Sequence, residues 1–271
     1  MGVSTAIAWT NHTFNIAWGC FKVSPGCKNC YADTFATNRV GLKIWGPPAT
    51  SDRRTFGPKH WNDPVRWNRE AEKAQVPAMV FSSSMCDIFE DHPTITQELA
   101  KLWPLVRATP WLDWQLLTKR HDRIVQSLPA DWGNGYPNVW LGVSVEDQEY
   151  ADLRIPSLLA VPAHVHFISY EPALGPVDLL PYVDPSRDRR LEWVIYGGES
   201  GPGYRKEDKQ WARDAHAACA WAGIPFFHKQ SSAPRTEMGI ELDGKIVREF
   251  PTSAPRFKLA TLAGMQPPAP W

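Results

Sequence analysis

The sequence has 271 residues, which suits one large α/β domain or two small ones. Its 29 basic and 29 acidic residues cancel, so there is no global field to hold a polyanion, and any nucleic-acid contact must come from a local patch. No run approaches the roughly 20 apolar residues of a membrane span, and residues 1–14 lack the basic and apolar regions of a signal peptide. Five cysteines, three of them clustered, favour a reducing cytosol over a secreted disulfide framework. We therefore expect a cytoplasmic protein without membrane association.

Short apolar segments alternate with helical patterns along most of the chain. After an N-terminal arm at 1–12, strands are expected at 15–19, 78–83, 113–118, 139–145, 164–170, 193–196 and 224–228. Helices are expected at 31–41, 63–75, 94–107, 121–128, 147–160 and 207–222, with an irregular excursion at 42–62. Apolar strands alternating with helices predict an α/β fold whose parallel sheet is covered by helices. About seven such units favour a partial or nearly closed (β/α) barrel over a three-layer Rossmann sheet.

The C-terminal part has a different pattern. Asp243-Gly244 lies between two short alternating runs and is a strong signal for a β-hairpin. The segment 251–271 contains several prolines and is expected to hang loose or to wrap around the outside. We therefore divide the chain into a barrel domain at 1–231 and a C-terminal segment at 232–271.

Residues 13–32 contain Cys20, Cys27 and Cys30 at the spacing C-x6-C-x2-C. A tight turn brings the last two sulfurs to one side, and a loop that doubles back brings the first to the same place. A structural zinc site needs four protein ligands, and the nearest candidates for a fourth are His12, Cys86 and His60. A 4Fe–4S cluster is usually held by four thiolates, so three would leave one iron open for a small molecule. The spacing favours a cluster but leaves zinc and plain thiols open.

In β/α barrels the chemistry lies at the carboxyl ends of the strands. The expected strands of this chain end in polar side chains, namely Ser82, Ser83, Ser84 and Asp87; Thr118, Lys119 and Arg120; Ser144 and Glu146; Ser169, Tyr170 and Glu171; Glu199 and Ser200; His228, Lys229 and Gln230. Turns and helix caps also use serine and acidic residues. Repetition over six strands nevertheless favours one shared mouth.

Six sequence blocks carry a resemblance to a known family. They are VFSSSMCDIFED, QLLTKR, LGVSVEDQEYADLRI, HFISYEPALGPVDL, WVIYGGESGPGYR and GIPFFHKQ. Together they resemble a phage-encoded family of unknown function that is similar to the spore photoproduct lyase branch of the radical SAM superfamily. The cysteine spacing departs from the superfamily's C-x3-C-x2-C, and Asn29 replaces the usual aromatic residue before the last cysteine. Cys30-Tyr31-Ala32 is similar to the lyase branch.

The resemblance implies roles for the strand-end residues. Cys20, Cys27 and Cys30 would bind the cluster, and Lys119 and Ser144 would hold the carboxylate of S-adenosylmethionine (SAM). The remaining cofactor-binding residues are expected to be Tyr31, Ser82, Ser83 and Ser84. The expected catalytic residues are Cys86, as a hydrogen-atom donor, and Glu199. The expected substrate-binding residues are Tyr170, Glu171, Gly197, Gly198, Ser200 and Lys229. Each has a plainer explanation, such as a solvated lysine, a small buried cysteine, or a glycine turn followed by a helix cap.

The resemblance thus implies a radical SAM-like enzyme whose 4Fe–4S cluster cleaves SAM to a 5′-deoxyadenosyl radical. An electron donor such as flavodoxin or ferredoxin is implied, as is a nucleobase, nucleotide or nucleic-acid substrate, and phage origin would place the protein in the host cytoplasm. The basic residues expected to form a phosphate-binding rim are Lys119, Arg120, Arg123, Arg205, Lys206 and Lys229. Two other functions stay open: a zinc-stabilised nucleic-acid-binding protein without catalysis, and a metal-free barrel hydrolase using Glu171, Glu199 or His228.

Overall fold

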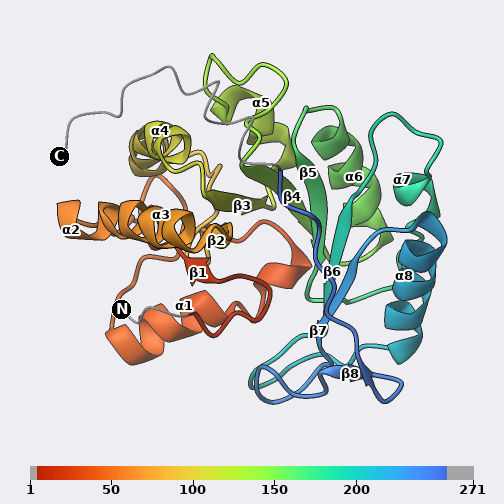
Figure 1. Ribbon diagram of the computed structural model, residues 1–271. Coiled ribbons are helices and arrows are strands. Elements are labelled where there is room, and N and C mark those ends of the chain that lie inside the picture. Colours follow the sequence, from red (N-terminus) through yellow and green to blue (C-terminus); the bar gives the residue numbers. More distant parts are fainter. Residues whose placement is uncertain (1–4, 255–271) are drawn as a thin grey trace.

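A curved sheet of seven parallel strands, arranged in chain order, organises the protein (Figure 1). The computed structural model describes residues 5–254. The strands are β1 (His12–Thr13), β2 (Ala78–Ser82), β3 (Leu112–Thr118), β4 (Val139–Val145), β5 (Val165–Tyr170), β6 (Trp193–Gly197) and β7 (Phe226–Gln230). The sheet curls into a half-barrel (Figure 1). It stays open along one side, because β1 and β7 are its two edge strands and do not pair with each other. This confirms the α/β parallel barrel expected from the sequence.

The first strand differs from the expectation. It was expected at 15–19 but comprises only His12–Thr13, whose partners in β2 are Val80 and Phe81. Beyond this pair the chain leaves the sheet, because the backbone of Trp18 bonds that of Arg54 in both directions. Residues 15–19 therefore do not extend β1 but connect it to the cysteine loop. Apolar periodicity does not reveal this departure, which is decided by a contact with a distant segment.

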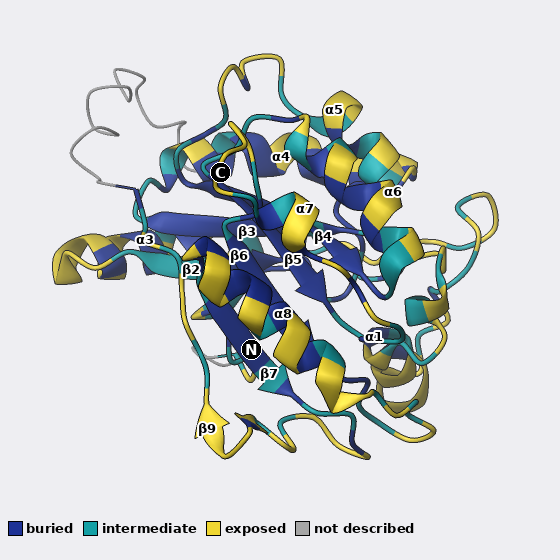
Figure 2. Ribbon diagram, turned by 90° about the vertical axis from the view of Figure 1, so that its right-hand side faces the viewer, coloured by how far each residue is buried: buried dark blue, intermediate teal, exposed yellow. Residues whose placement is uncertain are grey.

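Helices cover the convex face of the sheet (Figure 1). They are α2 (Pro58–Trp61), α3 (Asp63–Ala74), α4 (Pro93–Ala108), α5 (Ile124–Ser127), α6 (Gln148–Leu159), α7 (Leu180–Val183) and α8 (Lys209–Ala222). The short α1 (Tyr31–Phe35) continues as a π-helical turn at Ala36–Val40, and single 3₁₀ turns lie at Pro25–Cys27 and His121–Arg123. Figure 2 shows the alternation of buried and exposed positions along α8, whose buried residues Ala212, Ala215, Ala218, Cys219 and Ala222 face the sheet. The expected helix at 121–128 is thus split into a 3₁₀ turn and a short α-helix.

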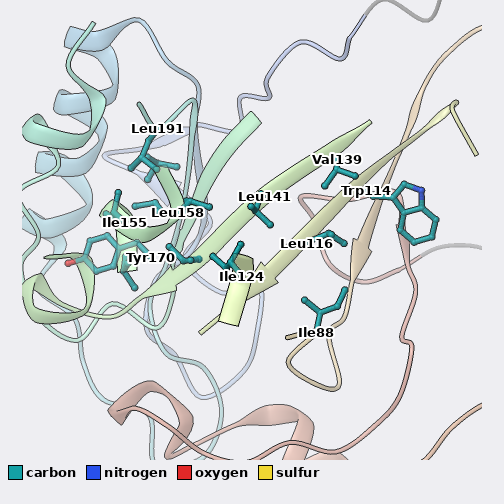
Figure 3. Close-up of a cluster of buried hydrophobic side chains, with 14 of the residues drawn as sticks. Ile88, Trp114, Leu116, Ile124, Val139, Leu141, Ile155, Leu158, Tyr170 and Leu191 are labelled. Atoms are coloured by element: carbon teal, nitrogen blue, oxygen red, sulfur yellow. The ribbon is translucent and has the colours of Figure 1, made fainter. Parts of the chain in front are cut away.

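The main hydrophobic core lies between the sheet and these helices. Side chains of alternate strand residues point into it, as period-two geometry requires. Figure 3 shows Leu141 of β4 and Leu116 of β3 in this layer, with Tyr170 of β5 beside Ile155 and Leu158 of α6. The intervening strand residues must therefore point to the concave face.

Aromatic and aliphatic side chains fill the part of the concave face that is nearer the amino ends of the strands. The buried members of this second cluster are Trp9, Phe81, Trp140, Val165, Phe167, Trp193, Ile195 and Phe227. Most of them lie near the start or middle of their strands, whereas Phe81 lies near the end of β2 and Trp9 lies in the segment before β1. Towards the carboxyl ends of the strands the concave face becomes polar: Ser169 and Lys229 come two positions after Phe167 and Phe227, and Ser144 comes four positions after Trp140.

The C-terminal segment packs against the half-barrel. The expected hairpin is confirmed as β8 (Glu241–Leu242) and β9 (Lys245–Ile246). After it, Phe227 and Arg248 form an antiparallel bridge, so the chain runs beside β7. Most of the segment expected to be a loose tail, 255–271, lies outside the described residues. Within 5–254 no helix is long and apolar enough to cross a membrane.

Candidate functional site

A cavity of about 430 Å³ opens at the carboxyl ends of the strands. Its wall combines the cysteine loop with residues at the ends of β2 to β7 or shortly after these strands, as the β/α topology requires. The polar and sulfur-containing lining residues are Cys20, Lys22, Cys27, Asn29, Cys30, Tyr31, Ser83, Ser84, Met85, Cys86, Asp87, Thr118, Lys119, Arg120, Ser144, Ser169, Glu171, Glu199, Ser200, Lys229 and Thr236. The strand ends and the three clustered cysteines therefore share one space.

The three clustered thiols have different hydrogen-bond partners. Arg120 approaches the Cys20 Sγ at 3.8 and 3.9 Å, and the Ser24 hydroxyl lies 3.6 Å from the Cys27 Sγ. Cys30 lies at the N-terminus of α1. Burial raises the pKa of the Cys30 thiol, and hydrogen bonds from the first backbone amides of α1 partly offset this. Burial likewise raises the pKa of Cys20, against the charge of Arg120.

The three thiols are soft donors that line one cavity. Within residues 5–254, no three His, Cys, Asp or Glu side chains are grouped so as to hold a metal ion. In a 4Fe–4S cubane each thiolate binds a different iron, so its ligands do not meet at one point. The donor set, three soft thiols that line one cavity, fits a cluster with one iron left open.

Buried carboxylates at two strand ends anchor the cysteine loop. Glu146, after β4, accepts a 2.7 Å hydrogen bond from the Ser24 hydroxyl. Glu199, after β6, accepts a 3.0 Å hydrogen bond from the Asn29 amide. A Cβ on Gly26 would lie 2.5 Å from the Glu146 Oε1, so only glycine lets the loop approach this carboxylate so closely. The loop's shape is thus set by the barrel mouth as well as by its own sequence.

Glu146 also pairs with the lysine expected to bind SAM. The Lys119 Nζ lies 2.8 Å from the Glu146 Oε1, and Arg154 lies 3.1 Å from the Oε2. Burial of Glu146 disfavours its charge, but the two cations and the Ser24 hydroxyl outweigh burial and lower its pKa. The carboxylate thus stays ionised and fixes Lys119 at the cavity wall beside Ser144, which also lines the cavity. Lysine carries three donors, so the pair leaves capacity for a further acceptor.

The segment after β2 contributes Ser83, Ser84 and Cys86 to the cavity wall. Tyr31 lies with them, since its hydroxyl donates a 2.9 Å hydrogen bond to the Ser84 carbonyl. Ser82 differs from the expectation, because it is fully buried and is absent from the wall. Burial raises the pKa of the Cys86 thiol to about 12, so this sulfur keeps its proton at neutral pH.

The late strands contribute fewer wall residues than expected. Glu171, Ser200 and Lys229 line the cavity. Lys229 forms an ion pair with Glu171. Tyr170 does not line it, because strand alternation turns its side chain to the helix side, where Figure 3 shows it. Ser169, one residue earlier, lines the wall in its place. Alternate residues of a strand point to the same face, so Phe167, Ser169 and Glu171 share the concave face and Tyr170 does not. The sequence alone could have indicated this.

Gly197 and Gly198 also lie off the cavity wall. A Cβ on Gly198 would be 2.0 Å from the Glu207 Oε2 and 2.2 Å from the Ser232 amide. The missing side chain therefore admits protein atoms, not a ligand. Glu199, expected to be catalytic, lines the cavity but is engaged by Arg205 through its backbone amide at 2.8 Å and its Nε at 2.9 Å.

The expected basic rim is largely neutralised. Arg120 is 8% exposed and pairs with buried carboxylates, whereas Arg123 pairs with Asp91 at 2.8 Å. Lys119, Arg205 and Lys229 are paired as described above. Lys206 keeps an exposed position. Five of these six cations are therefore paired with carboxylates of the same chain.

Comparison with solved structures identifies the fold. A spore photoproduct lyase double mutant with bound AdoMet and dinucleoside spore photoproduct matches with a TM-score of 0.50 at 13% identity, covering 80% of this chain. This chain spans 63% of that structure. A second spore photoproduct lyase structure, complexed with dinucleoside spore photoproduct, has a TM-score of 0.47 at 14% identity, covering 75% of this chain and 59% of the other. No curated protein matches the sequence significantly.

The fold is thus an α/β half-barrel similar to that of spore photoproduct lyase. The chain belongs to the family described as "Protein of unknown function (DUF5131)", whose model matches residues 4–251. The match includes the cysteine loop, all seven strands of the sheet and the C-terminal hairpin. The family assignment therefore applies to the half-barrel together with its candidate site.

Proposed function

We propose that this protein is a radical SAM enzyme acting on a nucleobase or a nucleic-acid-related substrate. The observation that carries the proposal is the shared cavity. Cys20, Cys27 and Cys30 line the same space as the strand-end residues Lys119 and Ser144. Three thiolates with an open fourth position, beside a lysine able to hold a carboxylate, are what SAM bound to a 4Fe–4S cluster requires.

The chain's own residues have separable roles in this proposal. The three cysteines hold the cluster, and Lys119 and Ser144 bind the carboxylate of SAM. Ser83, Ser84 and Tyr31 also line this cavity. When bound, the cluster and SAM supply a reducing electron and a carbon radical able to abstract hydrogen. The protein seats the cofactor, orients the substrate and excludes water.

Cys86 is a candidate hydrogen-atom donor. It lines the cavity, and its raised pKa keeps the S–H bond intact, which a hydrogen donor requires. Glu171, Ser200 and Lys229 offer acceptors and donors to a base or sugar on the other side of the cavity. An electron donor such as flavodoxin or ferredoxin belongs to the same proposal, because the cluster must be reduced.

The two alternatives have less support. The cysteines do not group with other side chains around a single ion within the described chain, which disfavours a structural zinc site. A metal-free hydrolase would use Glu171, Glu199 or His228 as its acid or base. Lys229 pairs with Glu171, however, and Arg205 pairs with Glu199. His228 stacks on Tyr196 away from the cavity wall, and burial lowers its pKa.

The experiment is reductive cleavage of SAM. Protein reconstituted anaerobically with iron and sulfide is treated with dithionite and SAM, and 5′-deoxyadenosine is measured by chromatography. We expect cleavage that depends on both the cluster and the reductant. Reconstituted, reduced protein that binds SAM but never forms 5′-deoxyadenosine or methionine contradicts the proposal.

A further inference from the structure

The guanidinium group of Arg120 contacts the sulfur of Cys20 but not the sulfurs of Cys27 and Cys30. Both terminal nitrogens of Arg120 approach the Cys20 Sγ, at 3.8 and 3.9 Å. One of them also donates a 2.8 Å hydrogen bond to the Phe21 carbonyl. Arg120 follows β3, so it links the end of a rigid strand to the first cysteine of the loop.

Arg120 is held in place by two buried carboxylates. Its Nη1 lies 2.9 Å from the Asp87 Oδ2, and its Nη2 lies 3.2 Å from the Glu90 Oε1. Glu90 in turn pairs with Arg53 through two hydrogen bonds of 2.8 and 2.9 Å. Arg53 donates further bonds to the carbonyls of Ile44, Gly46, Ser51 and Asp52, so the loop beside the cysteines is tied to the same network.

This network is costly to bury and has no direct part in the proposed chemistry. The side chains of Arg53 and Glu90 are 0% and 1% exposed, and those of Arg120 and Asp87 are 9% and 7% exposed. Removing ions from water costs several kcal/mol each before pairing. The charges of Arg53 and Arg120 balance those of Asp87 and Glu90, so the network is neutral as a whole. A Cys20 thiolate would contact its positively charged member, Arg120.

The other two thiols have only neutral hydrogen-bond partners. Cys27 has the Ser24 hydroxyl, and Cys30 has the backbone amides at the start of α1. The potentials of iron–sulfur clusters depend on net charge and on hydrogen bonds to the sulfurs. A cation beside one ligand favours the reduced cluster, because reduction adds a negative charge nearby.

We propose that Arg120 is a positioning residue that fixes the Cys20 thiolate and raises the reduction potential of the cluster. The inference rests on the proposed function and deepens it, since it assigns control of the one-electron step to a residue outside the cysteine motif. Asp87 and Glu90 act through Arg120 by fixing its guanidinium group, and Arg53 acts through Glu90. Removing the charge of Arg120 must therefore make the cluster harder to reduce.

The test is a potentiometric titration, followed by electron paramagnetic resonance without SAM, of anaerobically reconstituted protein. Arg120→Gln should keep its iron and shift the reduction equilibrium about tenfold toward the oxidised cluster, which is about 59 mV for one electron. Arg120→Lys should fall between this variant and the wild type, because it keeps the charge but loses the planar fork. Arg123→Gln is the matched control, since Arg123 lies three residues further on and pairs with an exposed carboxylate. It should leave the potential unchanged.

Three results would overturn the inference. The first is a wild-type potential in iron-loaded Arg120→Gln, which removes the charge. The second is failure of both variants to take up iron while circular dichroism shows the wild-type fold, because Arg120 would then build the site instead of tuning it. The third is a wild-type protein that binds no cluster, and this result alone also overturns the proposed function.

Discussion

Glu199→Gln tests whether the mouth of the barrel holds the cysteine loop. The Glu199 side chain is 4% exposed and pairs with Arg205, which also donates a 3.1 Å hydrogen bond to the Pro25 carbonyl of the loop. Asn29 binds the same carboxylate at 3.0 Å. Breaking a fully buried pair costs about 3–5 kcal/mol. The Arg205 side chain is 32% exposed and can turn to water, so we expect a smaller loss of about 2 kcal/mol in the free energy of unfolding.

Urea unfolding of the metal-free protein at neutral pH measures this loss. Glu70→Gln is the matched control, because Glu70 pairs with Arg66 at 3.6 Å on the exposed face of α3 and should matter by less than about 1 kcal/mol. Burial opposes the charge of Glu199, but the bonds from Arg205 and Asn29 outweigh it and lower its pKa. Its stabilisation is therefore present above the unfolded-state pKa of about 4.3 and disappears as the pH falls through the lower folded-state pKa. Equal stabilities of the two variants at neutral pH would refute this reasoning.

Three further substitutions or reactions probe the cavity. Lys119→Ala should weaken SAM binding about tenfold without loss of iron, because one charged donor to the carboxylate is removed; unchanged affinity by calorimetry would rule this out. Gly26→Ala should cost about 1–3 kcal/mol and lower the iron content, because the new Cβ would lie 2.5 Å from Glu146. Gly57→Ala, where nothing lies within 4 Å of the new Cβ, is its control, and equal effects of the two substitutions would contradict this account. Cys86, with its pKa of about 12, should react slowly with iodoacetamide in mildly alkaline buffer; alkylation at the rate of an exposed thiol, measured by mass spectrometry, would show that assignment to be wrong.

The sequence predicts the sheet well because its strands are short apolar runs bounded by turn residues. Six of the seven expected strands lie within a few residues of β2 to β7. The exception, β1, has only two paired residues and is defined by its partner β2. The shared cavity was also predictable, since parallel strands in chain order bring their carboxyl ends to one edge.

The contacts that shape the site were not predictable in the same way. Asn29 and Glu199 are 170 residues apart in the chain, and no spacing indicates that they meet. The pairing of Arg53 with Glu90 has no sequence signal either, yet it supports Arg120 beside Cys20. The orientation of Tyr170 was predictable from strand alternation, whereas the packing of Gly198 against Ser232 depends on the distant segment after β7.

Iron and acid-labile sulfide content after anaerobic reconstitution tests the central claim most directly. The wild type and Cys219→Ala, in which a buried helix cysteine is removed, should each bind about four iron and four sulfide per chain and absorb in the visible range. Cys27→Ala should lose most of both. Full iron and sulfide in Cys27→Ala, or a colourless wild type that binds only zinc, would contradict a cluster held by Cys20, Cys27 and Cys30.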